Sequence, residues 1–331
     1  MAILTFAGFV IYTNLHAQDT FSIVAADSTS REVGSAGASC VDLFSAGFAD
    51  PSFLGQLLPD TGAINTQADY TPANQNNARM RMRAGDTPTQ VINWLAKHDA
   101  GGNSSVRQYG VVGFTGANAS AAGFTGSNCI NYKNHITGNI DGIYYSIQGN
   151  ILLGQQILDS MESNFRNAEG DLACRLMASM QGANVVGADT RCTKDGTSSL
   201  FAFLKVAQPT DSYGSPSFNI SLRTRDNSRI EPIDSLQTIF DAQHSCLMTG
   251  IQGVLESPSL RVYPNPAKDE ITIKSEPSLI GSQYIISDSS GKDLVIGIIK
   301  DEIQQVGIKQ LIPGMYILRI GQKHQVSFIK N

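Results

Sequence analysis

A threonine at position 20 stands directly behind an apolar leader and at the head of a predicted β-strand, TFSIVAAD. A threonine hydroxyl is a weak nucleophile until a base takes its proton, and the α-amino group of an N-terminal threonine can be that base. An α-amine has a reference pKa of about 7.7 to 8.0, so much of it can accept a proton at neutral pH. The sequence therefore predicts a nucleophile at Thr20, on condition that the chain is cut before it.

The leader, AILTFAGFVIYT followed by NLHAQ, decides whether that cut occurs. It is shorter than the roughly 20 apolar residues of a membrane span, and we assign residues 1–18 to a secretory signal peptide. Cleavage after Ala17 would leave Gln18 and Asp19 in front of Thr20. A second cleavage, or self-processing at the Asp19–Thr20 bond, is then required. The alternative is that the leader forms a buried first strand.

The composition limits the classes of partner. With 331 residues and 41% hydrophobic content, the chain can bury a substantial core. A formal charge of -5 and the absence of a basic cluster exclude nucleic acid as an expected partner. The five histidines form no metal-ligand spacing with one another or with the five cysteines, so we predict neither a metal nor a cofactor. No membrane span is predicted in the mature chain.

The elements that must position Thr20 predict a layered α+β domain. TFSIVAAD and EVGSAGASC form a predicted hairpin around STSR, and five more apolar runs are predicted strands. Thr87 is predicted to cap a helix that has Pro88 at its first position. Two further helices are predicted in ILLGQQILDSMESNF and GDLACRLMASMQG. Strands at both ends with helices between them favour sheets inside and helices outside.

The pattern changes near residue 248. We predict a domain over residues 19–247, a polar linker over 248–259 and a second domain over 260–331. The last region consists of short strands with turn residues at steady spacing, which is typical of a small all-β sandwich.

That last region resembles the C-terminal sorting domain of the type IX secretion (Por) system of Bacteroidetes. The resemblance rests on YPNPAKDEITI, SSGK and PGMYILRI followed by QVSFIK. It implies recognition by the type IX secretion machinery, passage through the periplasm, and a secreted or surface-attached product. The alternative is an ordinary accessory β-sandwich that binds sugar or protein.

The main domain resembles the uncharacterised bacterial family called domain of unknown function 1028. The resemblance rests on TFSIVAAD, TQADY, RQYGVV, FTGSNC, YSIQGNIL and GADTRC. It implies the fold of the Ntn (N-terminal nucleophile) hydrolases, an αββα four-layer sandwich. Family members typically begin Met-Thr-Phe-Ser, so that removal of the methionine frees the threonine; this chain departs from that pattern.

Two residues near the end of the second strand follow from this resemblance. Ser39 is expected near Thr20, where it could hydrogen-bond the amine. Many relatives carry a lysine where this chain has Cys40, and losing that charge would weaken activation of the hydroxyl. Thr20 itself has an alternative interpretation as an ordinary β-favouring strand residue.

The remaining site residues are two pairs. Gln148 and Asn150, with Gly149 between them, are expected to stabilise an oxyanion, or else to cap a helix beginning at Ile151. Asp189 and Arg191 are expected to form a charge pair that orients the site, or else a purely structural ion pair. His135 is interpreted as a loop or core histidine.

The cysteines predict at least one disulfide, because the leader and the tail both direct the chain to an oxidising compartment. Cys40, Cys129 and Cys192 belong to or adjoin the family motifs, so we expect them near one another. Cys174, on a predicted helix, is expected to be the free thiol.

Two functions follow as hypotheses. The first is an exported Ntn-type amidohydrolase that acts on a small amide, such as a peptide or a cell-wall fragment. The second is a catalytically silent Ntn-fold binding protein at the cell surface. A purely structural module finds no support, because the sequence has no repeats and no low-complexity segment.

Overall fold

A computed structural model describes residues 20–246, 260–288, 292–320 and 324–331. The described residues form two compact units, one that ends at residue 246 and one that begins at residue 260. The predicted leader and the predicted linker lie outside the described residues. None of the helices in the described parts of the chain has the length and hydrophobicity of a membrane span.

The first unit contains two antiparallel sheets. The larger sheet has the order β10 (Phe218–Arg223), β9 (Phe201–Ala207), β2 (Val33–Ser39), β1 (Phe21–Asp27), β8 (Ile143–Gly149), β7 (Asn134–Ile140). The smaller sheet has the order β3 (Gly55–Leu58), β4 (Gly62–Gln67), β5 (Gln108–Thr115), β6 (Asn118–Thr125).

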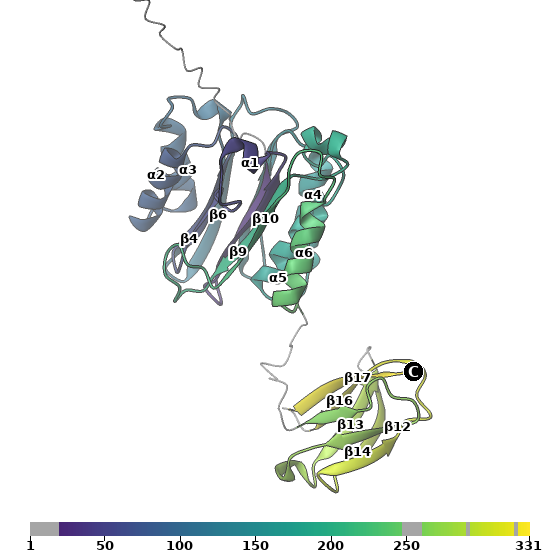
Figure 1. Ribbon diagram of the computed structural model, residues 1–331. Coiled ribbons are helices and arrows are strands. Elements are labelled where there is room, and N and C mark those ends of the chain that lie inside the picture. Colours follow the sequence, from purple (N-terminus) through teal and green to yellow (C-terminus); the bar gives the residue numbers. More distant parts are fainter. Residues whose placement is uncertain (1–19, 247–259, 289–291, 321–323) are drawn as a thin grey trace, which may run out of the picture. The chain divides into compact units, whose positions relative to one another are not determined.

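Side-chain alternation along β1 builds the layers. Phe21 and Ile23 face the helices on one side of the larger sheet. Val24 packs on the other side with residues of the smaller sheet, because successive strand residues point to opposite faces. The smaller sheet covers its own outer face with two helices through Ile64 and Val111. Two sheets therefore lie inside and the helices outside, as the sequence predicted (Figure 1).

The helices belong to two separate layers (Figure 1). One layer contains α2 (Pro72–Arg83) and α3 (Pro88–Lys97). The other contains α4 (Gln155–Asn167), α5 (Leu172–Gly182) and α6 (Pro232–Gln243). A short α1 (Leu43–Ala46) and two 3-10 turns, η1 (Ser104–Val106) and η2 (Thr190–Asp195), lie in the connections.

The start of α3 confirms the predicted cap. The Thr87 side chain accepts a hydrogen bond from the Gln90 N–H, and the Gln90 side chain accepts one from the Thr87 N–H at 2.8 Å. This reciprocal capping box satisfies two N–H groups that the helix itself leaves unpaired. Val91 and Leu95 are fully buried on the inner face.

The start of α4 corrects the sequence prediction. The helix begins at Gln155 rather than at Ile151. The N–H groups of Ile151, Leu152 and Leu153 instead donate to carbonyl groups of two neighbouring loops, at 3.0–3.1 Å. Because these groups are already paired, the helix starts only after them. Gln148 and Asn150 therefore do not cap it.

Two helices escaped the sequence analysis for different reasons. α2 is rich in amides, and its buried face includes Asn74 and Gln75, so it shows no apolar stripe. α6 does carry a stripe, formed by Ile233, Leu236 and Phe240. That spacing of three and four residues could have predicted it.

The second unit is all-β, as predicted. One sheet has the order β11 (Arg261–Tyr263), β12 (Glu270–Lys274), β15 (Ile303–Gly307). The other has the order β14 (Asp293–Ile298), β13 (Gln283–Asp288), β16 (Gly314–Ile320), β17 (His324–Lys330). A short 3-10 turn, η3 (Pro277–Leu279), precedes β13. Aliphatic and aromatic side chains from both sheets share one core.

Candidate functional site

The candidate site lies where four strands of the first unit begin or end together. Thr20 directly precedes β1, Gln67 ends β4, Gln108 begins β5 and Gly149 ends β8. Thr20 is almost completely buried, at 2% exposure. By alternation along β1 its side chain lies on the same face as Ser22 and Val24, toward the smaller sheet.

Asn150 holds Thr20 from two directions. The backbone nitrogen of Thr20 donates to Asn150 Oδ1 at 3.2 Å. The backbone nitrogen of Asn150 donates in turn to the carbonyl oxygen of Thr20 at 3.2 Å. Asn150 is itself buried, at 1% exposure. The atom that would become the α-amine of a processed chain therefore already has a fixed acceptor.

Gln67 fixes Thr20 from the smaller sheet. Its Nε2 donates to the Thr20 carbonyl oxygen at 3.0 Å and to Gln108 Oε1 at 2.8 Å. Its Oε1 accepts from Ser22 Oγ at 2.5 Å. Gln148 joins the same network, because its Nε2 donates to Ser22 Oγ at 2.7 Å. The Gln148 amide thus lies between the two sheets beside Ser22, two residues along β1 from Thr20.

The network continues to His135. Gln108 Nε2 donates to Thr125 Oγ1 at 2.9 Å, and Thr125 Oγ1 lies 2.9 Å from His135 Nδ1. Burial lowers the pKa of His135, so the neutral imidazole is favoured at neutral pH. His135 is connected to Thr20 through three side chains (Thr125, Gln108 and Gln67) instead of touching it.

Asp189 and Arg191 form the predicted charge pair beside β2. Arg191 donates to both carboxylate oxygens of Asp189, through Nε at 3.0 Å and Nη2 at 2.6 Å. Asp189 is fully buried and also accepts from the Cys40 N–H at 2.9 Å. Arg191 Nη2 reaches Ser39 Oγ at 3.4 Å. Ser39 follows Ala38, the residue that pairs with Phe21, so it lies across from Thr20.

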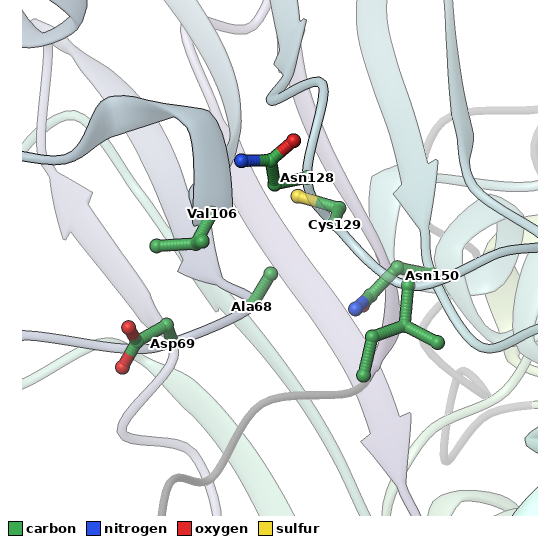
Figure 2. Close-up of a pocket in the computed structure, with 7 residues that line it drawn as sticks. Ala68, Asp69, Val106, Asn128, Cys129 and Asn150 are labelled. Atoms are coloured by element: carbon green, nitrogen blue, oxygen red, sulfur yellow. The ribbon is translucent and has the colours of Figure 1, made fainter.

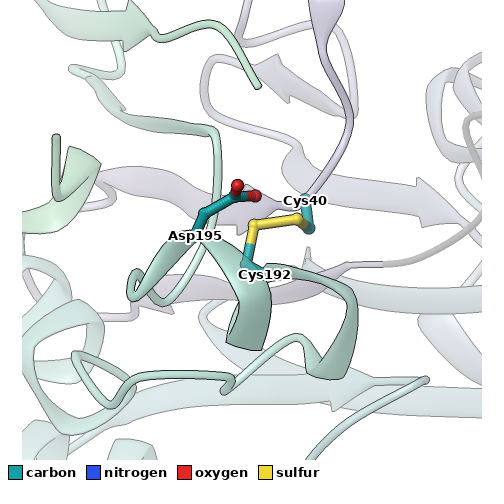
Figure 3. Close-up of side chains that lie close together, drawn as sticks. All are labelled: Cys40, Cys192 and Asp195. Carbon is teal, nitrogen blue, oxygen red and sulfur yellow. A yellow bond between two sulfur atoms is a disulfide. The ribbon is translucent and has the colours of Figure 1, made fainter. Parts of the chain in front are cut away.

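A disulfide closes this side of the site. Cys40, directly after β2, is bonded to Cys192 in η2, and Asp195 lies beside the pair (Figure 3). These three residues have the composition of a metal-ligand set, but sulfurs joined in a disulfide cannot serve as thiolate ligands. The bond fixes the turn that carries Asp189 and Arg191 to the end of β2.

The second disulfide corrects the sequence prediction. Cys174 of α5 is bonded to Cys246, which follows α6. Cys174 is therefore not the free thiol, since the chain after α6 returns to α5. Cys129 is the cysteine outside both disulfides, and it is buried. Its Sγ donates to the carbonyl oxygen of Arg107 at 3.3 Å.

A pocket opens next to Asn150 (Figure 2). It encloses about 280 Å³, including space open to solvent, and is lined by Ala68, Asp69, Val106, Asn128, Cys129, Ile130 and Asn150. The side-chain nitrogen of Asn150 turns toward it (Figure 2). Ala68 and Asp69 both have left-handed backbone, with φ of 48° and 31°. Strained backbone of this kind concentrates at functional sites.

Sequence analysis missed an ion cluster behind the pocket. Arg107 donates to both oxygens of Asp99, at 2.8 and 3.2 Å, and its Nη1 lies 3.4 Å from Asp69 Oδ2. Burial raises the pKa of Asp99, but hydrogen bonds from Arg107, from the Asn103 N–H and from Asn74 outweigh it and lower the pKa to about 2. Polar residues at the ends of otherwise apolar strands, as in TQADY and RQYGVV, were the signal available in the sequence.

The comparisons with known proteins agree with the two units. A family model described as "Family of unknown function (DUF1028)" matches residues 20–236. A model described as "Secretion system C-terminal sorting domain" matches residues 261–331. No curated protein matches the chain.

Two solved structures are similar. One is a protein of the same family of unknown function from Silicibacter pomeroyi, with 20% identity, a TM-score of 0.52, and coverage of 68% of this chain and 89% of the other. At that identity it shows a shared fold only. The other is PorZ, a surface component of the type IX secretion system of Porphyromonas gingivalis, with 20% identity and coverage of 25% and 12%. At a TM-score of 0.19 we draw no conclusion from this similarity.

Proposed function

The chain belongs to the DUF1028 family of unknown function, and we propose that its first unit is an Ntn-type amidohydrolase with Thr20 as the nucleophile. The αββα layering around Thr20 is the arrangement that Ntn hydrolases share, which supports the assignment. The sorting domain at residues 261–331 indicates a secreted or surface-located protein that engages the type IX secretion machinery.

The observation that carries the proposal is the bond from the Thr20 nitrogen to Asn150 Oδ1. In a processed chain this nitrogen is a neutral amine, and one of its N–H groups would keep that acceptor. The lone pair then remains to take the proton of the Thr20 hydroxyl. A general base held at a fixed position beside its nucleophile is what acyl transfer requires.

The chemical sequence follows from this geometry. Thr20 Oγ1 attacks the carbonyl carbon of an amide while its proton passes to the α-amine. The carbonyl oxygen becomes an oxyanion, for which the Asn150 side-chain nitrogen that faces the pocket is the donor we assign. The α-amine returns the proton to the leaving amine, the C–N bond breaks, and an ester to Thr20 remains. Water then hydrolyses the ester.

The other predicted residues take supporting roles in this proposal. Gln148 positions Thr20 indirectly. It donates a hydrogen bond to Ser22, and Ser22 donates one to Gln67, which holds Thr20. Ser39 lies across from Thr20 on the β2 side, and Arg191, held by Asp189, donates to Ser39.

One observation favours the second hypothesis, a binding protein that does not cleave its ligand. Position 40, where the family resemblance leads us to expect a lysine in many relatives, is half of a disulfide and supplies no ammonium group. A site without that charge activates its hydroxyl less strongly, so a chain that remains joined at Asp19–Thr20 would bind an amide without cleaving it.

The N-terminus of the exported protein separates the two hypotheses. Mass spectrometry should find a chain that begins at Thr20. That chain should hydrolyse amides from a panel of acyl anilides, Thr20→Ser should retain part of the activity, and Thr20→Ala should abolish it. Thr20→Ala should cost only about 1 kcal/mol of unfolding free energy. Thr137→Ala, on an exposed position of β7, is the matched control and should change nothing. An exported chain that begins at Gln18 or Asp19 and hydrolyses no amide would leave the binding protein as the better account.

A further inference from the structure

We propose that the substrate of this site is an amide that carries an aliphatic chain, and that an apolar rim beside the pocket binds that chain. The rim consists of Ile130, Leu153, Val185 and Val186. This inference rests on the pocket being the site of the proposed amide hydrolysis, and it names the substrate class of that site.

Exposure sets these four residues apart. Ile130 is 51% exposed, Leu153 49%, Val185 42% and Val186 56%. A single exposed aliphatic residue needs no explanation, but several on adjoining segments beside a pocket indicate a ligand or partner site. Of the four, Ile130 lines the pocket directly. The other three lie on two backbone segments that are hydrogen-bonded in turn to the segment of Ile130.

Backbone hydrogen bonds hold the three segments of the rim side by side. The Ile151 N–H donates to the Ile130 carbonyl oxygen at 3.1 Å, and the Leu153 N–H donates to the Ala188 carbonyl oxygen at 3.1 Å. The Ala188 N–H donates to the Val185 carbonyl oxygen at 2.8 Å. The rim is therefore built on a paired backbone, and not on a single loop.

Continuity with the pocket decides which occupant we assign. Ile130 belongs to the rim and also lines the pocket, next to Asn150. Asn150 holds Thr20. The path from the nucleophile thus runs from a polar end, suited to an amide group, to an aliphatic end. A substrate of matching shape has an amide at one end and a hydrocarbon chain at the other.

The experiment measures affinity against chain length. N-acetyl-, N-butanoyl-, N-hexanoyl- and N-octanoylglycinamide are titrated calorimetrically into the exported protein, with a parallel series of N-alkylacetamides to distinguish the two ends of the amide. In one series the affinity should rise about twofold per methylene, less than full burial would give because the rim covers only one side of the chain.

Two variants assign the effect to the rim. Leu153→Ser combined with Val186→Ser should remove the dependence on chain length and leave the affinity for the acetyl compound unchanged. Met80→Ser, on α2 and 58% exposed, is the control and should keep the full dependence.

The outcomes are distinct from those of the proposed function. Equal affinity along both series, no binding at all, or a dependence that survives in the double variant would overturn the aliphatic-chain inference. A dimer in sedimentation that dissociates in the double variant would overturn it too, because a second copy would then cover the rim. Failure of the proposed function appears separately, as an absence of hydrolysis by a chain that begins at Thr20, whatever the affinities are.

Discussion

The two units of this chain differ in the buried amides that lie between the sheets of the first unit and not in the core of the second. Between the sheets of the first unit lie Ser22, Asn65, Gln67, Gln108 and Gln148, each at 0–1% exposure. The core of the second unit is aliphatic and aromatic, with Ile271, Ile273, Ile286, Leu318 and Phe328 at 0–1%.

Buried amides stabilise a fold only weakly, and each one destabilises it if it loses a partner. Those of the first unit are hydrogen-bonded to one another and to the backbone around Thr20. An interior of this kind fixes the position of groups at some expense of stability. An aliphatic interior gives stability and positions nothing polar. We infer that the first unit is built around a site and the second around folding.

The cysteines follow the same division. All five lie before residue 247, and four of them form the two disulfides of the first unit. The single tryptophan, Trp94, also lies in the first unit, on α3. Its fluorescence therefore reports unfolding of that unit alone, which makes the comparison measurable.

Deletion of residues 260–331 should have the largest effect, an all-or-none loss of export. The sorting-domain model matches residues 261–331, and the residues of the candidate site described above all belong to the first unit. The truncated chain should stay in the periplasm. The denaturation midpoint of its first unit, followed by Trp94 fluorescence, should be unchanged. Truncated protein in the medium or at the surface would refute the sorting role, and a lowered Trp94 midpoint would show that the units depend on each other.

Cys40→Ser combined with Cys192→Ser should lower the unfolding free energy of the first unit by about 5 kcal/mol, because the bond closes a long loop in the unfolded chain. The two cysteines are 152 residues apart, against 72 for Cys174 and Cys246. Removing the second bond should therefore cost about 0.7 kcal/mol less, by loop entropy alone.

Denaturant titrations followed by Trp94 fluorescence measure both disulfide variants. Far-UV circular dichroism of the same samples should show that the transition of the second unit does not move. A shift of that transition would break the comparison, since the second unit contains no cysteine.

Asp99→Asn should give the smallest effect of these changes, a difference in unfolding free energy that depends on pH in the acid range. The pKa of Asp99 is lowered to about 2 in the folded protein, against an ordinary value of 3.8. A carboxyl group whose pKa is lower in the folded protein stabilises the fold at every pH above its ordinary, unfolded pKa. This contribution is lost as the pH falls toward the pKa of the folded protein. The difference in unfolding free energy between the wild type and Asp99→Asn should narrow by about 2 kcal/mol from pH 5 to pH 2.

An exposed carboxylate supplies the control for that measurement. Asp241→Asn, on the surface of α6, is measured in parallel under the same conditions. If the Asp99→Asn difference did not change with pH, Arg107 would not hold the Asp99 carboxylate in the way its two hydrogen bonds indicate.

Local signals in the sequence determined much of this fold. The turn residues STSR predicted the β1–β2 hairpin, and Thr87 with Pro88 predicted the start of α3. The tail strands followed from turn residues at steady spacing, although β15 (Ile303–Gly307) was missed. Each of these features depends on residues within a few positions of one another, so a single sequence contains the whole interaction.

The tertiary structure alone decided the partners in the site. Asn150 contacts Thr20 across 130 residues of chain, Cys174 bonds to Cys246 and not to a motif cysteine, and Ile151 donates to a loop instead of starting a helix. Such contacts depend on which strands become neighbours and in which register. A shift of one residue in register turns every side chain of a strand to the opposite face. Thr20 could be identified from the sequence because one N-terminal threonine supplies both the hydroxyl nucleophile and the amine that acts as base. The groups that hold it are set by the register of β1 against β8, which only the folded chain defines.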